Sequence, residues 1–376
     1  MKTAMILREP LGEQSPLAVL TKARQRHQDT RMLARLSRTS RTLRPAVVMA
    51  MLSAVLACGG EKAAPTAPSA PTPPPIPSMA AGTALTFVSG EGAVPVAGAS
   101  VVIAGQSSAG PFSDTMTADS QGRIVLGRPV LLTPPPTMDV VAAGYLTRNT
   151  VLRTDGAQLF SLWPNDGVAP ADLVATLVYS PSACPAANAP TLSMRRLHTG
   201  APAVLVLDAS VQDETAVARH EEAVARLNAI LGSAQYSVSR SPAPAGAVVF
   251  TVKVDASPAQ CTAPENTTRV IAFTNVNFST VGEIVGGSIV YCEPRWAQAA
   301  GTVTHEIGHT AGFRHSPNLT DVMYCTTSRR TNSFSDREAG AMSFMRQRRS
   351  GNRWPDNDRD TTASLAAGSG ETFVCY

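Results

Sequence analysis

The stretch from Thr304 to Cys325 reads THEIGHTAGFRHSPNLTDVMYC and decides how this chain can be understood. With the residues before it, its first part forms the segment AQAAGTVTHEIGHTAG (297–312), in which apolar residues recur every three or four positions: Ala300, Val303, Ile307 and Ala311. This spacing predicts a helix with one side facing the core.

Three histidines on and after this helix have the spacing of metal ligands. His305 and His309 are one helical turn apart, so both imidazoles leave the same side of the helix, and Glu306 lies beside the first of them. Gly312 is predicted to end the helix in the left-handed conformation, which brings His315 round as a third nitrogen ligand. Three neutral nitrogens leave a fourth position for water, an arrangement typical of catalytic zinc.

In such a site the glutamate handles protons. Zinc lowers the pKa of a bound water to about 7, and Glu306 would take the proton as the water attacks an amide carbonyl. The histidines, Glu306 and Gly312 fit the pattern H-E-x-x-H-x-x-G-x-x-H, which resembles that of the metzincin zinc metallopeptidases. Met323 stands where their Met-turn methionine lies beneath the metal.

Ser316, directly after the third histidine, makes the stretch look most like the matrixins among the metzincins. The resemblance implies a twisted mixed sheet with an active-site helix, one Zn²⁺ ion and a peptidase activity. The chain departs from the matrixin pattern at Cys325, which replaces a proline and could tie the pocket wall to another segment by a disulfide. The family's calcium loops and propeptide switch sequence are absent, so calcium is not supported.

The first 57 residues are basic, whereas the rest of the chain is slightly acidic. They hold ten of the 32 Lys and Arg residues and three of the 28 Asp and Glu residues. The rest therefore has 22 basic and 25 acidic side chains, a net charge of −3. Because no basic stripe interleaved with aromatics occurs, nucleic acid is excluded as a partner.

Residues 1–57 are predicted to be a leader that ends in a secretory signal peptide. Its apolar run AVVMAMLSAVLA (46–57) follows four basic residues: Arg35, Arg38, Arg41 and Arg44. An apolar run of this length is too short for an ordinary membrane span. Since the leader is unusually long, Met32 is an alternative start.

The residues VLAC (55–58) resemble the lipobox of bacterial lipoproteins. The resemblance implies lipidation of Cys58 and a membrane anchor; the alternative is an ordinary signal peptide cut elsewhere. Residues 58–80 are rich in Pro, Ala and Ser, which predicts a semi-rigid tether. We therefore expect an exported cell-envelope lipoprotein facing the periplasm or the cell surface.

Residues 81–166 are predicted to form a small β-sandwich, because short runs of strand composition are split by Gly, Pro and Asp. VPVAGASVVI (94–103), TADSQGRIVL (117–126) and VVAAGY (140–145) resemble the carboxypeptidase regulatory-like, transthyretin-like sandwich. An immunoglobulin-like sandwich is the alternative. Residues 167–200, rich in Pro and Ala, are predicted to be a linker.

Residues 201–376 are predicted to form the zinc metallopeptidase domain, which gives the chain an α+β fold class. Strands are expected at 203–209, 247–254, 270–278 and 287–292. Helices are expected at 213–231, capped by Asp213, and at 335–348, where Ser335 and Glu338 form a capping box.

Five cysteines remain once Cys58 is assigned to lipid: Cys184, Cys261, Cys292, Cys325 and Cys375. Two disulfides and one thiol are predicted for an oxidising compartment. A Cys184 thiol that blocks the zinc as a latency switch is the alternative to its pairing.

Three further features are expected to carry no chemistry. His198, beside a Thr-Gly turn, and His220, on the polar side of its helix, are predicted to be surface residues. Neither has ligand spacing to a partner, so no metal role is expected. The acidic segment DNDRD (356–360) lacks the glycine and distal glutamate of a calcium loop and is predicted to be solvated.

Together these features predict a zinc-dependent endopeptidase that hydrolyses extracellular or envelope proteins through a zinc-bound water and the base Glu306. A protein or peptide substrate is expected to add as a strand to one edge of the sheet. The sequence does not indicate which of the strands from Ala247 to Cys292 forms that edge. The alternative is a non-catalytic surface lipoprotein in which zinc stabilises a scaffold and the β-sandwich binds.

Overall fold

The computed structural model describes residues 75–153, 158–181, 192–197, 200–262, 269–328, 331–359 and 369–376. Residues 72–376 cluster as one compact unit. The predicted leader, residues 58–74 of the predicted tether with Cys58, and also Cys184 and His198 lie outside the described residues. The described end of the tether, residues 75–80, includes the short strand β1 (Ser78–Met79), so the N-terminal sheet begins before the predicted boundary at residue 81. Among the residues that are described, no helix combines the length and apolarity needed to cross a membrane.

The N-terminal part consists of two β-sheets that share a core. The larger sheet has the order β1-β6-β3-β7-β8, with β4 paired to β3, and the smaller has the order β5-β2-β9. Their bounds are β1 (Ser78–Met79), β2 (Ala84–Ser89), β3 (Ser100–Ser107), β4 (Gly110–Thr117), β5 (Arg123–Val125), β6 (Val130–Leu131), β7 (Thr137–Val141), β8 (Arg148–Val151) and β9 (Leu159–Leu162).

Alternation of side chains explains this core. In β3, Val101 and Ile103 are fully buried while Ser100 is exposed, as expected for a strand with one face on the core. Phe87 of β2 stacks on Phe160 of β9 with ring centroids 5.8 Å apart, which joins the two strands of the smaller sheet. Strand β4 has no fully buried residue, and the sequence patterns did not predict it.

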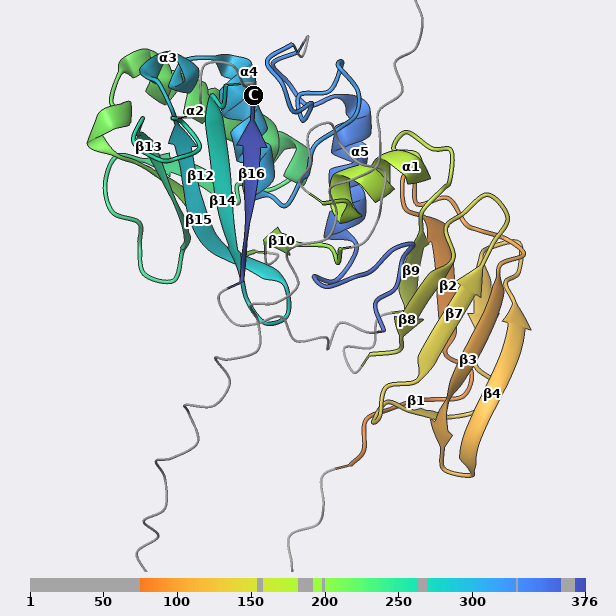
Figure 1. Cartoon of the computed structure of the whole chain (residues 1–376). Helices are drawn as coiled ribbons and strands as arrows, with labels where there is room; N and C mark the ends of the chain where they lie inside the picture. The colour runs from red at the N-terminus through yellow and green to blue at the C-terminus, as the bar shows by residue number, and fades with distance from the viewer. Residues whose placement is uncertain are drawn as a thin grey trace, which may run out of the picture. The chain divides into compact units, whose positions relative to one another are not determined.

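The C-terminal part is built on a mixed sheet with the order β12-β11-β13-β15-β14-β16, and β10 pairs with β15 (Figure 1). Neighbouring strands are parallel up to β15, whereas β14 runs antiparallel to both β15 and β16. The strands are β10 (Arg196–Leu197), β11 (Ala203–Leu207), β12 (Tyr236–Ser239), β13 (Val248–Val254), β14 (Ala272–Phe278), β15 (Glu283–Tyr291) and β16 (Gly370–Cys375).

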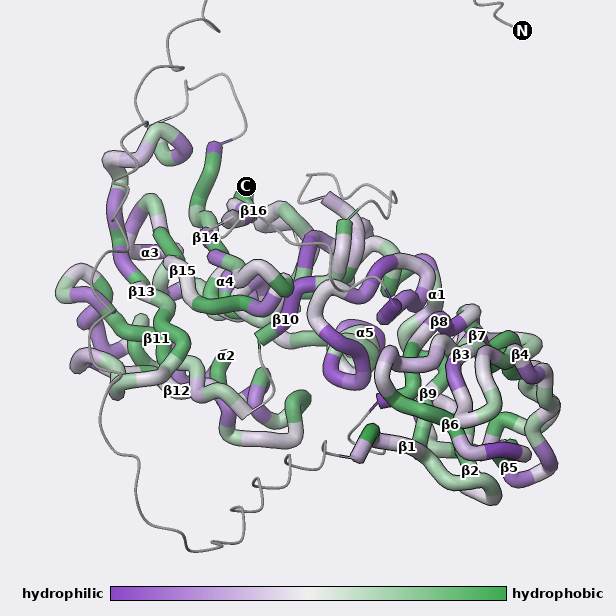
Figure 2. The backbone as a smooth tube through the Cα atoms, turned by 90° about the horizontal axis from the view of Figure 1, so that it is seen from below, coloured by the Kyte–Doolittle hydropathy of each residue, from purple (hydrophilic) through white to green (hydrophobic). Residues whose placement is uncertain are grey.

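Three helices pack against this sheet: α2 (Glu214–Leu231), α3 (Pro294–Ala297) and α4 (Ala300–Thr310). Helix α5 (Asp336–Arg346) packs on α2, and a 3-10 turn, η2, lies at Ala209–Val211. Helix α4 contacts α2, β14 and β15. Strand β11 is almost uniformly hydrophobic (Figure 2), as expected for an inner parallel strand. The predicted α+β fold class is confirmed at this level.

Local capping signals in the sequence are confirmed. The Asp213 side chain accepts hydrogen bonds from the backbone N–H groups of Thr215 and Ala216, and α2 begins at the next residue. Ser335 and Glu338 form the predicted capping box at the start of α5. Both signals depend on residues within one turn of the helix terminus, which is why sequence reasoning can find them.

Part of the range predicted as a linker, 167–200, is buried in the C-terminal core. It holds α1 (Ala171–Val174) and a π-helical turn, η1 (Ala175–Tyr179), in which every residue is buried. The Leu177 carbonyl accepts a hydrogen bond of 2.9 Å from the backbone N–H of Arg314, just before the third histidine. This segment therefore supports the turn that carries His315.

In the acidic segment 356–360, which was predicted to be solvated, Asp356 and Asp358 are buried instead, at 0 % and 2 % exposure. Asp356 pairs with Arg348 at 2.7 Å and Asp358 pairs with Arg148 of β8 at 3.4 Å. Asn352 donates hydrogen bonds to both carboxylates. Buried charges need such partners, and this network links β8 to the segment that follows α5.

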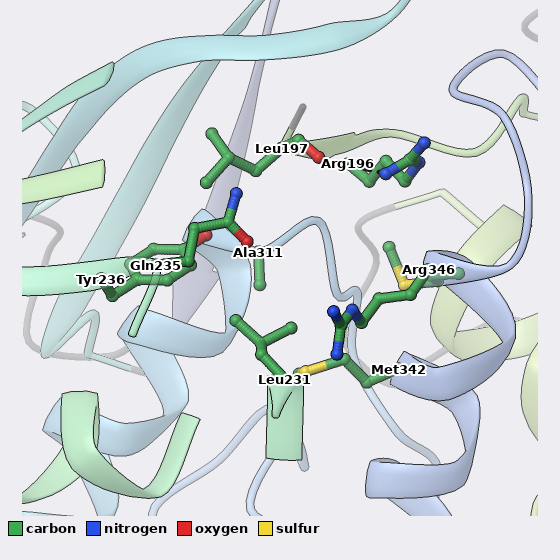
Figure 3. Close-up of a pocket in the computed structure, with 9 residues that line it drawn as sticks. Arg196, Leu197, Leu231, Gln235, Tyr236, Ala311, Met342 and Arg346 are labelled. Carbon is green, nitrogen blue, oxygen red and sulfur yellow. Dashed lines mark hydrogen bonds between the residues drawn. The ribbon is translucent and has the colours of Figure 1, made fainter. Parts of the chain in front are cut away.

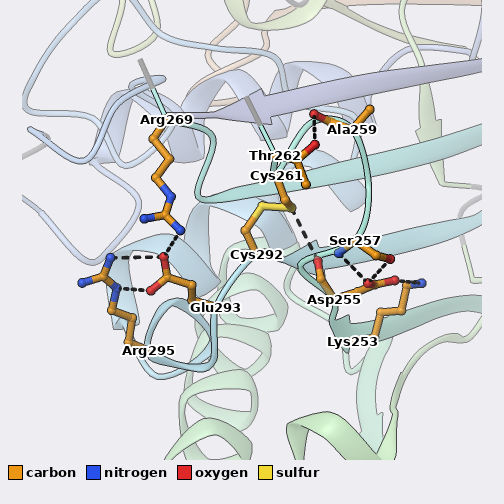
Figure 4. The surroundings of a disulfide bond; sticks show 10 residues. All are labelled: Lys253, Asp255, Ser257, Ala259, Cys261, Thr262, Arg269, Cys292, Glu293 and Arg295. Atoms are coloured by element: carbon orange, nitrogen blue, oxygen red, sulfur yellow. Dashed lines mark hydrogen bonds and ion pairs between the residues drawn. A yellow bond between two sulfur atoms is a disulfide. The ribbon is translucent and has the colours of Figure 1, made fainter. Parts of the chain in front are cut away.

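One disulfide joins Cys261 to Cys292 at the end of β15 (Figure 4). Beside it, Asp255 accepts hydrogen bonds from Lys253 and Ser257. Cys325 is also disulfide-bonded, as its departure from the matrixin pattern suggested.

His220 is fully buried, so the prediction that it lies on the surface is wrong. Its Nδ1 lies 2.7 Å from the Ala216 carbonyl and its Nε2 lies 3.1 Å from the Tyr291 hydroxyl. The buried positions Ala216, His220, Ala223 and Leu227 follow the 3–4 spacing of one helix face. Burial lowers the pKa of His220 to about 4.

This lowered pKa predicts a loss of stability in acid. The native state holds His220 neutral, whereas the unfolded chain protonates it below about pH 6.5, so stability is lost as the pH falls from about 6.5 to about 4. We expect wild type to lose about 3 kcal/mol more than His220→Gln over this interval. Urea unfolding at several pH values measures the difference, and parallel pH profiles for the two proteins would contradict it.

Candidate metal centre

Helix α4 and the turn after it bring the three predicted histidines together. The ring centroids of His305 and His309 are 4.6 Å apart, and that of His315 lies 5.3 Å and 4.9 Å from them. One nitrogen from each ring lies within 4.8 Å of the others, close enough to hold one metal ion. All three side chains are at most 2 % exposed.

Gly312 makes the turn to His315 possible. Its φ of +102° lies in the left-handed region, which disfavours residues with a side chain. A Cβ atom at this position would lie 2.0 Å from the Arg195 carbonyl oxygen. The prediction that glycine ends the helix here is therefore confirmed, for steric as well as conformational reasons.

Backbone carbonyls fix the orientation of two of the rings. The Nδ1 atom of His305 lies 2.8 Å from the carbonyl oxygen of Val322, and the Nδ1 atom of His309 lies 2.7 Å from that of Phe313. A carbonyl oxygen can only accept, so each Nδ1 must carry the proton. In a neutral imidazole the Nε2 atom then holds a lone pair.

The two Nε2 atoms face each other at 3.1 Å. Two lone pairs at this distance repel unless a cation lies between them, either a shared proton or a metal ion. Histidine ligands of metals usually donate their other ring N–H to a carbonyl in this way. The donor set of His305, His309 and His315 therefore fits a metal ion, on the geometry of the rings alone.

Glu306 is fully buried and is held by the neighbouring strand. Its Oε2 accepts a 2.6 Å hydrogen bond from the Thr274 hydroxyl of β14. Sequence analysis did not single out Thr274, because only the packing of α4 on β14 brings the two residues together. The contact fixes the carboxylate beside the first histidine.

Met323 packs against α4 at Gly308, which lies between the two helical histidines in the sequence. A Cβ atom at Gly308 would lie 2.4 Å from the Met323 sulfur, so only glycine leaves room for the methionine. The segment that carries Met323 is bonded to the residue after His315, because the backbone N–H of Ser316 donates to the Met323 carbonyl at 2.8 Å. Met323 therefore packs on the helix that carries His305 and His309, and its position beneath a metal ion stays a prediction.

Helix α5 holds the turn that carries Met323. Glu338 accepts the backbone N–H groups of Val322 and Met323 at 3.3 Å and 2.9 Å. Burial raises the pKa of Glu338 to about 7. Since Val322 also accepts the His305 proton, the capping residue of α5 indirectly positions the first histidine.

The histidine cluster is separate from the small cavity shown in Figure 3. That cavity has a volume of about 30 Å³ and is lined by residues that include Tyr236, Arg196 and Arg346. It has room for about one water molecule. None of the three clustered histidines lines it.

Comparisons with protein-family models and with curated proteins found no match. The assignment of chemistry to this site therefore depends on its own geometry.

The geometry predicts one divalent metal ion per chain. We expect His309→Ala to weaken metal binding by more than about a hundredfold, because it removes a ligand rather than an outer partner. Glu306→Gln should retain the metal, and His220→Gln is the matched control, since His220 is buried but lies outside the cluster. Calorimetric titration of metal-free protein measures this, and equal affinity in His309→Ala and wild type would refute it.

Proposed function

We propose that this chain is a zinc-dependent endopeptidase that resembles the matrixins among the metzincins. The observation that carries the proposal is the convergence of the Nε2 atoms of His305 and His309, with His315 adjacent and a buried carboxylate beside the first ligand. A purely structural metal site has no need of that carboxylate.

Zinc is the metal that this donor set favours. Three neutral imidazoles with no oxygen ligand are a common catalytic zinc site, whereas calcium and magnesium prefer oxygen ligands. When bound, the zinc ion would supply a Lewis acid that activates water and polarises the scissile carbonyl.

Glu306 supplies the proton transfers in this proposal. Its carboxylate takes a proton from the attacking water and later gives it to the leaving amine. Thr274 holds Oε2 by a hydrogen bond, so the carboxylate is kept in one orientation throughout. Burial of the pair also keeps bulk water away from the proton path.

Export and anchoring belong to the same proposal. The apolar run at 46–57 and the lipobox-like residues at 55–58 support a lipoprotein anchored through Cys58. The Cys261–Cys292 disulfide supports an oxidising compartment. The N-terminal sheets would act as a carboxypeptidase regulatory-like spacer or binding module.

One observation favours the alternative, a non-catalytic scaffold. The three histidines and Glu306 are almost completely buried, and β16 packs beside them. A peptide cannot reach the cluster while this arrangement persists, so catalysis requires that β16 can be displaced.

The carboxylate provides the direct test. Zinc-loaded wild type should hydrolyse an unfolded protein, and Glu306→Gln should lower the rate by about 10²- to 10⁴-fold while keeping one zinc ion. Thr274→Val should cause a smaller loss, of about tenfold, since it removes one hydrogen bond to a charged group. Zinc content and peptide products are measured on the same samples. If wild type and Glu306→Gln both hold zinc and neither cleaves, even after residues 370–376 are removed from each, the scaffold is the better account.

A further inference from the structure

The last strand of the chain pairs with the strand that would otherwise form the sheet edge beside the metal cluster. β16 runs antiparallel to β14, with Phe373 opposite Thr274 and Cys375 opposite Ala272. Figure 1 shows β16 ending near α4, with the C-terminus at its tip. Without β16, the backbone of β14 would be an open edge able to accept an extended peptide.

Two side chains of β16 face the cluster. The Phe373 ring stacks on His309 with centroids 4.3 Å apart and an interplanar angle of 11°. The Cys375 sulfur lies within 4.8 Å of ligand atoms of both His305 and Glu306. The strand thus places an aromatic ring over one histidine and a thiol beside the proposed base.

The chain's end is also bonded on its other side. The backbone N–H of Tyr376 donates to the Cys325 carbonyl at 3.1 Å, and that of Thr327 donates to the Tyr376 carbonyl at 2.7 Å. The C-terminal residues therefore lie between β14 and the loop that follows Met323. Main-chain bonds on both sides make this a groove suited to an extended peptide of varied sequence.

Side-chain contacts anchor the start of β16. Arg314, which is 1 % exposed and next to His315, pairs with Glu371 at 3.1 Å. Thr372 donates a 2.7 Å hydrogen bond to Asn275 of β14. These contacts fix the register in which Phe373 meets His309.

We infer that residues 370–376 act as an autoinhibitory strand that occupies the edge of β14, facing residues 325–327, where an extended substrate would add. The inference rests on the proposed endopeptidase function and names how that site is regulated. The preferred peptide is extended, runs antiparallel to β14, places an aromatic side chain over His309 and a small residue two positions later beside Glu306.

Tethering makes the resident strand a strong competitor. A segment of the same chain has an effective concentration that reaches the millimolar range, at the upper end of ordinary enzyme KM values. A substrate that displaces β16 gains the same main-chain hydrogen bonds with β14 that β16 loses. Which of the two binds therefore depends on their side chains and on the covalent link that keeps β16 nearby. The site is therefore closed until the C-terminal strand is removed or displaced.

The test uses a chain that ends at Ser369 and a fluorescent peptide of residues 370–376 carrying Cys375→Ser. The zinc-loaded truncated protein should bind this peptide, whereas the full chain should bind it at least about tenfold more weakly. A peptide that also carries Phe373→Ala should bind about tenfold more weakly, and Thr372→Ser, at an exposed position and with the hydroxyl bonded to Asn275 retained, is the control. Truncation should raise kcat/KM at least about tenfold.

A second pair of variants covers failure of the truncated chain to fold. Phe373→Ala in the full chain should increase both peptide binding and hydrolysis, and Thr372→Ser, which keeps the hydrogen bond to Asn275, should change neither by as much. If the wild-type full chain and the Phe373→Ala full chain bind the peptide equally, the inference that β16 blocks the groove is wrong.

The readouts separate the two proposals. If the peptide binds in a sequence-dependent way but neither wild type nor any variant hydrolyses a substrate, the endopeptidase proposal is wrong and the groove proposal stands. If the truncated protein hydrolyses a substrate but does not bind the peptide, the groove proposal is wrong and the endopeptidase proposal stands.

Discussion

Two hydrogen bonds from histidine Nδ1 atoms to backbone carbonyls determine the chemistry of this molecule. They fix the protons of His305 and His309 on the side away from the cluster, so both Nε2 lone pairs point at one place. Without these bonds the rings could adopt the other tautomer and bond to each other. With them, the pair is stable only around a cation.

The rest of the C-terminal fold keeps those two carbonyls in place. The Phe313 carbonyl can reach His309 because the chain turns at Gly312. The positive φ of Gly312 and the backbone next to it exclude a side chain there. The Val322 carbonyl is available because Glu338, the capping residue of α5, holds the adjacent N–H groups. Helix α5, distant in sequence from the three histidines, thus helps to hold the candidate metal centre in place.

Sequence alone predicts the features that depend on local geometry. The spacing of His305 and His309 and the caps at Asp213 and Ser335 involve residues within about one helical turn, so periodicity and propensity reveal them. Gly312 was predicted for the same reason.

The features that sequence reasoning missed all depend on contacts between distant segments. Thr274 reaches Glu306, His220 reaches Tyr291 and Phe373 reaches His309 only through the packing of strands and helices. The alternating residues ETFVCY (371–376) are a signal for β16, but strand composition does not say which edge a strand joins.

X-ray absorption spectroscopy of the protein loaded with one zinc ion tests the central claim most directly. The convergence of His305, His309 and His315 predicts three imidazole nitrogens at about 2.0–2.1 Å from the metal. A first shell with fewer than three imidazoles, or one made of oxygen atoms, would contradict it.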